Sequence, residues 1–202
     1  MEERAAMTDG GGDDADLDGI VAFLQGAAAL KDTLRSGHTV AGTRESTAEH
    51  TWRLSLLALL CARRVPGLDA LRLLELCIVH DLGEAISGDV PAIDAPGQAG
   101  KAARERADLH TLCTPLPAGD AAHILALYDE YDAAVTPEAQ LARGLDKIET
   151  VLTHAIGANP PDFDYAFNLT YGAARTDAHP LLRALRSRAD AATRECMAAG
   201  DG

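Results

Sequence analysis

Apolar residues recur at helical spacing along most of this 202-residue chain, in segments that Pro and Gly residues separate. A repeat of three and four residues places such side chains on one face of a helix. Composition favours the same structure, because the chain has only eight aromatic residues, namely one Trp, four Tyr and three Phe. Leu and Ala must therefore fill most of the core, and both form helices at low energetic cost. The sequence predicts an all-α fold built as a helical bundle.

Capping and breaking residues mark the ends of the expected helices. Ser46 or Thr47 can cap the second helix, and the Pro66-Gly67 pair ends it. The Asn-Pro-Pro sequence at 159–161 forces an extended turn, because Pro lacks a donor and restricts the residue before it. A loop is expected over 94–100. We expect helices over about 17–36, 47–65, 69–82, 101–113, 120–133, 137–156 and 180–197, with a short segment after 83.

The length of the chain fits one domain, since a single core can remain continuous at this size. Residues 1–15 are rich in Gly and Asp, so we expect a disordered N-terminal tail followed by a single domain over 16–202. The polar start is unlike a signal peptide, and no apolar run reaches the roughly 18 residues that a membrane span needs. The sequence therefore predicts a cytoplasmic protein with no membrane partner.

The formal net charge of -13 argues against a nucleic acid polymer as partner. Binding to a phosphate backbone relies on clustered Lys and Arg side chains that release counterions. A small phosphorylated ligand is still compatible with this charge. One metal ion and one or two Arg residues can bind a single phosphate, because short-range contacts outweigh screened distant charges.

Three separated positions carry the candidate metal ligands. His80 and Asp81 end an otherwise apolar helix, where an imidazole and a carboxylate are costly to bury without partners. The pair is a weak signal alone, because such dipeptides arise by chance. His50 starts the preceding helix, and the tight turn between the two helices brings that start close to the end of the next helix. His50 and His80 are therefore expected to meet.

Asp146 completes the candidate set. It lies in the middle of a helix between Leu145 and Ile148, so its carboxylate should point partly inward and needs a cation or a donor. Two imidazoles and two carboxylates suit a borderline divalent ion that keeps open positions for water and substrate. The sequence predicts one divalent ion, with Co, Mn, Mg, Fe and Zn left open, bound by His50, His80, Asp81 and Asp146.

In order and spacing, these four residues resemble the HD-domain superfamily, named for its His, His-Asp and Asp pattern. The resemblance covers about residues 20–195 and implies an all-helical fold, an HD-domain helical bundle that is usually a homodimer. It implies hydrolysis of nucleoside 5'-monophosphates, in particular 2'-deoxynucleotides, with a divalent transition metal. The segments that resemble its 5'-deoxynucleotidase branch are 45–53, 77–84 with Gly88-Asp89, 145–149 and 159–165.

Two acidic residues are the expected catalytic groups. Glu84 follows His80 by four residues and shares its face if the helix continues past Gly83, so it could move protons or hold the water. The resemblance implies that this Glu is essential. Asp89 matches a second acidic position of the family, which orients the water or contacts the sugar. The alternative for Asp89 is a turn-stabilising role.

Arg35, His38 and Lys147 are the expected substrate-binding residues. Arg35 matches an arginine that follows the first helix of the family and could bind phosphate through paired donors, and a solvated Arg at a helix end is the alternative. His38 stands near the position of an aromatic residue that helps family members reject ribonucleotides, so the deoxy preference is left open. Lys147 and Glu149 flank Asp146 and either support it or form a surface ion pair.

Two other functions fit the same scaffold. Oxygenases with two irons need two further His ligands, and His110 and His123 occupy the required interval. A non-catalytic nucleotide-binding protein that kept the helical fold is the other alternative. It would bind a nucleotide and release no phosphate.

We also expect Trp52 to pack in the core beside the site.

Overall fold

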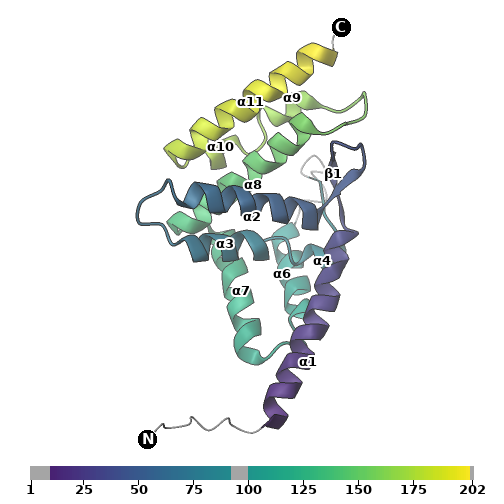
Figure 1. Cartoon of the computed structure of the whole chain (residues 1–202), viewed down its shortest axis with the longest axis vertical. Coiled ribbons are helices and arrows are strands. Elements are labelled where there is room, and N and C mark those ends of the chain that lie inside the picture. Colours follow the sequence, from purple (N-terminus) through teal and green to yellow (C-terminus); the bar gives the residue numbers. More distant parts are fainter. Residues whose placement is uncertain (1–9, 92–99, 201–202) are drawn as a thin grey trace, which may run out of the picture.

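The computed structural model of the chain describes residues 10–91 and 100–200, which fold mainly into helices (Figure 1). The all-α prediction is confirmed, with the addition of one small hairpin. In chain order the elements are α1 (Gly10–Ala27), the 3-10 helix η1 (Ala28–Lys31), β1 (Leu34–His38), β2 (Arg44–Ser46), α2 (Thr47–Ala62), α3 (Ala70–Val79), α4 (Glu84–Ser87), α6 (Lys101–Leu112), α7 (Ala118–Ala133), α8 (Pro137–Ile156), α9 (Tyr165–Asn168), α10 (Ala173–Thr176) and α11 (Pro180–Gly200).

Helix α8 lies at the centre of the packing. It starts where the Thr136 side chain accepts a hydrogen bond from the Ala139 amide, with Pro137 in its first turn. It packs against α2, α3, α7 and α11, and Figure 1 shows α11 lying along it at one end of the molecule. Aliphatic side chains fill the core as the composition predicts; the fully buried ones include Leu54, Leu73, Leu76, Leu109, Leu145, Ile148 and Leu182.

Helices α2 and α3 pack together in the way that the sequence predicts. A capping box starts α2, because the Ser46 hydroxyl accepts from the Glu49 amide and the Glu49 carboxylate accepts from the Ser46 amide. Asp69 caps α3. Between them Gly67 has a φ of 81°, a conformation that favours glycine. The start of α2 therefore lies near the end of α3.

The first helix ends earlier than expected. Instead of continuing to residue 36, it stops at Ala27 and is followed by η1 and the β1–β2 hairpin, with Leu34 opposite Ser46. Two glycines and several β-branched residues over 36–43 favour extended backbone and a turn. Gly42 supplies the turn with a φ of 83°.

Two further expectations are wrong in part. The disordered tail was expected over 1–15, yet residues 10–15 begin α1, where Asp13 interacts favourably with the helix dipole. Residues 1–9 and most of the expected 94–100 loop lie outside the described residues. Trp52 is 67% exposed rather than buried, because the core face of α2 follows His50 and Leu54.

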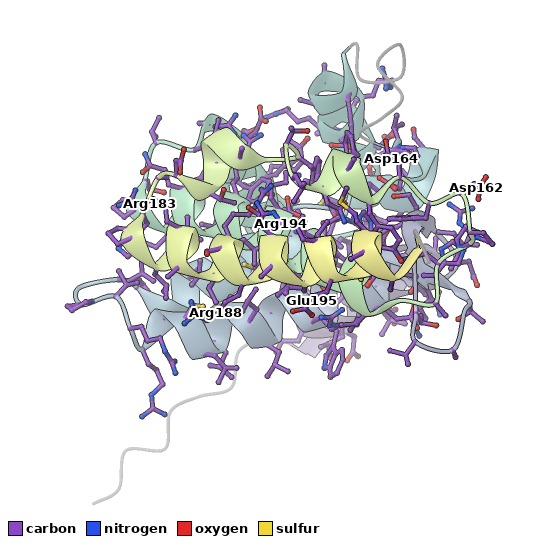
Figure 2. All side chains as sticks on the ribbon, turned by 90° about the horizontal axis from the view of Figure 1, so that it is seen from above. Asp162, Asp164, Arg183, Arg188, Arg194 and Glu195 are labelled. Carbon is purple, nitrogen blue, oxygen red and sulfur yellow. The ribbon has the colours of Figure 1, made fainter. Side chains whose placement is uncertain are left out.

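The C-terminal part of the chain covers α8. The short helices α9 and α10, which periodicity does not predict, follow the expected turn at 159–161 and precede α11. Figure 2 shows α11 running across this side of the molecule, with exposed charged residues along it that include Arg188 and Glu195. No helix in the described part of the chain is long and apolar enough to cross a membrane.

Candidate metal centre

Three buried side chains from three helical regions converge on one point. His50 comes from the first turn of α2, His80 follows the last residue of α3, and Asp146 lies midway along α8. Their ligand atoms all lie within 4.8 Å of one another. The Nε2 atom of His50 is 3.3 Å from Oδ1 of Asp146, and that of His80 is 4.0 Å from the same oxygen. The structure thus brings together residues that lie far apart in the sequence.

Asp81 joins this cluster from the turn after α3. Its Oδ2 atom lies 3.0 Å from Nε2 of His80 and 3.8 Å from Nε2 of His50. Its side chain is 16% exposed, whereas that of His50 is fully buried. Asp81 therefore forms the more open side of the cluster. All four residues predicted as ligands come together.

The hydrogen bonds of the two histidines suit metal binding. Nδ1 of His80 lies 2.9 Å from the carbonyl oxygen of Cys77, and Nδ1 of His50 contacts a carboxylate oxygen of Glu149. Such acceptors hold the proton on Nδ1 and leave a lone pair on Nε2. Both Nε2 atoms are buried without a hydrogen-bond partner. Two unsatisfied nitrogens beside two carboxylates fit a divalent ion.

The electrostatics of the cluster favour positive charge. Burial disfavours a charged His50, but the Asp146 and Glu149 carboxylates more than offset it and raise the pKa of His50 to about 9. Burial also disfavours a charged Asp81, but His80 and Arg35 hold its pKa well below the usual range. The cluster therefore attracts a cation, and a divalent ion can take the place of the proton.

The second oxygen of Asp146 is fixed by its neighbours. Tyr131 donates its hydroxyl to Oδ2 at 2.9 Å, and Nζ of Lys147 lies 2.8 Å from the same atom. Burial raises the pKa of Asp146, but Lys147 and both histidines outweigh it and keep that pKa well below its usual value. The surface ion pair considered for Lys147 and Glu149 is wrong, because Glu149 is buried against His50.

Glu84 sits beside the cluster on a separate helix. Helix α3 ends at Val79, so Glu84 does not continue its face as expected, and it opens α4 after a turn. Its carboxylate accepts from Thr47 at 3.1 Å and lies 3.4 Å from Nζ of Lys101. Burial, followed by the charges of Asp81 and other carboxylates, raises the pKa of Glu84 to about 9.

Lys101 links Glu84 to the other predicted catalytic residue. Its Nζ atom is 3.7 Å from Oδ1 of Asp89 and 3.2 Å from Oε1 of Glu105. Asp89 follows Gly88, whose φ of 80° turns the chain after α4. Both predicted acidic groups therefore face the same ammonium group. Lys101 could not be identified from the sequence, because it begins α6, which follows the site motifs without belonging to any of them.

Arg35 projects from β1 into the centre of the site. Nη1 lies 3.4 Å from Oδ2 of Asp81, and Nη2 donates to the Thr150 hydroxyl at 3.1 Å. Its Nε lies 3.5 Å from a carboxylate oxygen of Glu45. The side chain is 12% exposed, so the solvated Arg considered from the sequence is wrong. It is a cation held at the edge of the metal cluster.

A cavity of about 640 Å³ opens on this cluster, a size typical of small-molecule sites. Acidic residues surround the metal position, and cationic residues face them. Thr150 and His154 continue the lining along α8, and aromatic residues form the remaining wall. The cationic residues are Arg35, Lys101, Arg143 and Lys147; the acidic ones near the metal position are Asp81, Glu84, Asp89 and Asp146; the aromatic ones are Phe163, Phe167 and Tyr171.

His38 does not line this cavity. It borders a smaller, separate hollow together with Val40 and Trp52. The pairing of β1 with β2 is irregular between Leu34 and His38, and the strand presents Arg35 to the large cavity and His38 to the smaller hollow. The resemblance implied a place for His38 near the sugar of the substrate, whereas the structure places it at this separate hollow.

The two additional histidines of the oxygenase alternative lie away from the cluster. His110 is exposed on α6, and His123 is exposed on α7, where its Nε2 is 3.7 Å from Glu75. Among the described residues, neither belongs to a buried group that could hold a metal. The two-iron alternative is therefore unsupported.

The fold and the cluster define a helical domain with a built site for a divalent metal. The chain belongs to the HD domain family, whose sequence model matches residues 27–186. It is 33% identical to "5'-deoxynucleotidase hdd1" of Schizosaccharomyces pombe over 65% of this chain and 69% of that protein. It is 30% identical to "5'-deoxynucleotidase HDDC2" of Danio rerio over 67% of this chain and 68% of that protein.

A solved structure extends the similarity to almost the whole chain. A protein described as a predicted metal-dependent phosphohydrolase of Magnetospirillum magnetotacticum superposes with a TM-score of 0.73 and is 27% identical in sequence. The match covers 92% of this chain and 97% of that one. This structure and the sequence relatives together show that the chain is an HD domain of the 5'-deoxynucleotidase type.

Proposed function

We propose that this chain is a metal-dependent phosphohydrolase that removes phosphate from nucleoside 5'-monophosphates. The observation that carries the proposal is the pair of buried, unsatisfied Nε2 atoms of His50 and His80 beside Asp81 and Asp146. The relatives named 5'-deoxynucleotidases support the reaction and the substrate class. The divalent ion, when bound, supplies charge neutralisation and lowers the pKa of water.

Cationic side chains bind the phosphate in this proposal. Arg35 offers a guanidinium group beside Asp81, and guanidinium groups bind phosphate oxygens through paired donors. Lys147 lies within the same cavity and also holds Asp146. These local cations offset the overall negative charge of the chain, because contacts at a few ångströms outweigh screened distant charges.

Glu84 is the proposed proton carrier. Its raised pKa keeps a proton on the carboxyl group near neutral pH, so it can donate that proton to the leaving oxygen of the sugar. Thr47 and Lys101 hold the carboxyl group in place. Asp89 orients the water or contacts the sugar from the other side of Lys101.

The experiment is an assay of phosphate release from a panel of deoxynucleoside 5'-monophosphates, with and without a chelator. We expect release that stops with the chelator and returns when Co, Mn, Mg, Fe or Zn is added back. Glu84→Gln should keep metal and lose turnover. Metal-dependent binding of a nucleotide without any phosphate release would overturn the proposal and favour the non-catalytic alternative.

A preference for 2'-deoxynucleotides is part of the proposal and rests on the names of the relatives. His38 borders a separate hollow, so the proposal assigns it no contact with the 2'-oxygen. The ratio of kcat/KM for dAMP to that for AMP measures the preference. A ratio of one or less would remove the deoxy preference and leave the phosphohydrolase proposal intact.

We also propose that the chain acts as a homodimer in the cytoplasm, with one divalent ion per site. Leu17, Val21 and Leu24 lie on α1 with about half or more of their surface exposed, which supports an additional contact surface. Light scattering at several concentrations tests the dimer. A monomer at every concentration would contradict it.

A further inference from the structure

One wall of the cavity lies beyond the metal centre and is apolar. Four residues line the cavity on this side, and we call them the aromatic wall: Pro160, Phe163, Phe167 and Tyr171. They follow α8 in the chain, and the last three lie within or next to α9. The proposed hydrolysis uses none of these side chains. Aromatic surface concentrated in the same cavity therefore points to a part of the substrate other than the phosphate.

Hydrogen bonds fix the aromatic wall to the rest of the domain. The Asn159 side chain donates to the His154 carbonyl oxygen at 2.6 Å, at the point where the chain leaves α8. Arg186, which is buried on α11, donates to the carbonyl oxygens of Tyr171 and Asn168, each at 2.6 Å. The wall is thus tied to α8 at one end and to α11 at the other.

Helix α8 sets the distance between the metal position and the wall. Asp146, Thr150 and His154 all line the cavity and follow one another at four-residue spacing, so they lie on roughly the same side of α8. Each step advances about 6 Å along the helix. Thr150 binds Arg35, and the His154 ring lies 4.9 Å from that of Phe163. A nucleotide whose phosphate binds at the metal position and Arg35 therefore extends along this side of α8 towards Phe163.

Phe163 has a ring that can accept a flat partner. Its contacts with His154 and Tyr165 are edge contacts, with interplanar angles of 75° and 61°. Phe167 and Tyr171 instead stack on each other, with their ring centroids 5.3 Å apart. Among residues 10–91 and 100–200, no aromatic ring stacks flat on the ring of Phe163. A planar group of the substrate can take that place.

Charge orients a nucleotide in the same direction. Asp162 and Asp164 lie beside the aromatic wall and line the cavity, and Figure 2 shows Asp162 at the edge of the molecule. Asp164 accepts a hydrogen bond from the Phe167 amide, and both residues are exposed. Their carboxylates repel a phosphate dianion from this end, whereas Arg35 attracts it to the other end.

Resting on the proposed function, we propose that Phe163 and the aromatic wall hold the nucleobase of the substrate by stacking on its flat face. Every base has such a face, so stacking tolerates all of them. Phe163 is then a binding residue that acts through KM. Such a wall would allow one site to accept nucleotides that differ only in their base.

The test compares substrates with and without a base. Phosphate release is measured for the four deoxynucleoside 5'-monophosphates and for 2-deoxyribose 5-phosphate, with wild type, Phe163→Leu and Phe163→Ala. Leu keeps an apolar side chain but removes the π-face, which guards against a variant that fails to fold. Trp52→Ala is the matched control, because Trp52 is an exposed aromatic that lines a different hollow.

We expect KM for every deoxynucleotide to rise about 5- to 150-fold in the Phe163 variants. KM for 2-deoxyribose 5-phosphate should stay unchanged, and Trp52→Ala should change neither. An equal rise for both kinds of substrate, or no rise for the deoxynucleotides, overturns the inference.

Calorimetric titration with deoxyadenosine separates this inference from the proposed function. Deoxyadenosine carries the base but no phosphate ester, so its binding does not depend on hydrolysis. Binding to wild type that Phe163→Leu weakens supports the aromatic wall even if no phosphate is released from any substrate. Equal affinity for wild type and Phe163→Leu, or no binding to either, contradicts it.

Discussion

The Nε2 atom of His50 lies 3.3 Å from Oδ1 of Asp146, although the two residues belong to α2 and α8. A buried imidazole nitrogen needs a hydrogen bond or a metal ion, and a buried carboxylate needs a compensating positive charge. His80 and Asp81 approach the same point from the end of α3. The fold therefore concentrates four potential metal ligands in one place.

Glu149→Gln should weaken metal binding about 10- to 100-fold, as expected for loss of the partner that orients a liganding histidine. The substitution removes the charge that holds the proton on Nδ1 of His50. Calorimetric titration of the metal-free protein with Co or Mn measures the affinity for the metal. Glu195→Gln on the exposed side of α11 is the control and should bind as wild type. Unchanged affinity in Glu149→Gln would show that His50 needs no such partner.

Gly172→Ala should destabilise the chain more than Gly67→Ala. Both glycines have positive φ, of 66° and 81°, so each substitution costs about 1–2 kcal/mol. At Gly172 a Cβ atom would also lie 2.6 Å from Cβ of Lys147, which adds roughly 1–3 kcal/mol of overpacking, whereas nothing lies within 4 Å at Gly67. Urea unfolding compares the two. Equal losses would mean that the turn before α10 can move away from Lys147.

His154 should make stability fall as the pH is lowered below its ordinary pKa of 6.5. Burial, which outweighs the hydrogen bond to Asn168, lowers the pKa of His154 in the folded chain. Above pH 6.5 the residue is neutral in both states, so its contribution is fully present. Below that pH the unfolded chain takes up a proton that the folded chain resists, and stability is lost until the folded pKa is reached.

Urea midpoints from pH 7.5 to 5.0 measure this effect. Wild type should lose stability more steeply over that range than His154→Gln, which cannot titrate. The comparison uses slopes, because the substitution also changes the hydrogen bond to Asn168 and shifts stability at every pH. Parallel curves for the two proteins would show that burial of His154 does not shift its pKa.

The helices that the sequence predicts best are those with strong periodicity and clear ends. The expected 137–156 helix matches α8, because Thr136 caps it and Pro137 starts it. The β1–β2 hairpin was missed, because the apolar spacing of the first helix seemed to run on into residues that pair as strands. The place of His38 was inferred from the family resemblance, which does not show that the chain around it forms a strand.

The residues of the site also divide into those that the sequence predicts and those that it does not. The four candidate ligands lie together as the sequence predicts. The turn at Pro66-Gly67 brings His50 close to His80, and Asp146 faces inward on α8. Tyr131 and Lys101 were not, because each reaches the site from a helix whose approach depends on how the core packs. The sequence does indicate that Thr150 and Glu149 lie near the site, since both follow Asp146 by one helical turn and share its inward side of α8.

The metal content of Asp146→Ala tests the account most directly, when it is measured together with phosphate release from a deoxynucleoside 5'-monophosphate on the same sample. Asp129→Ala, which removes an exposed carboxylate that pairs with Arg106, is the control. The account predicts one divalent ion per chain and full turnover for wild type and Asp129→Ala, and neither metal nor phosphate release for a folded Asp146→Ala. Metal content and turnover at wild-type levels in Asp146→Ala would contradict it.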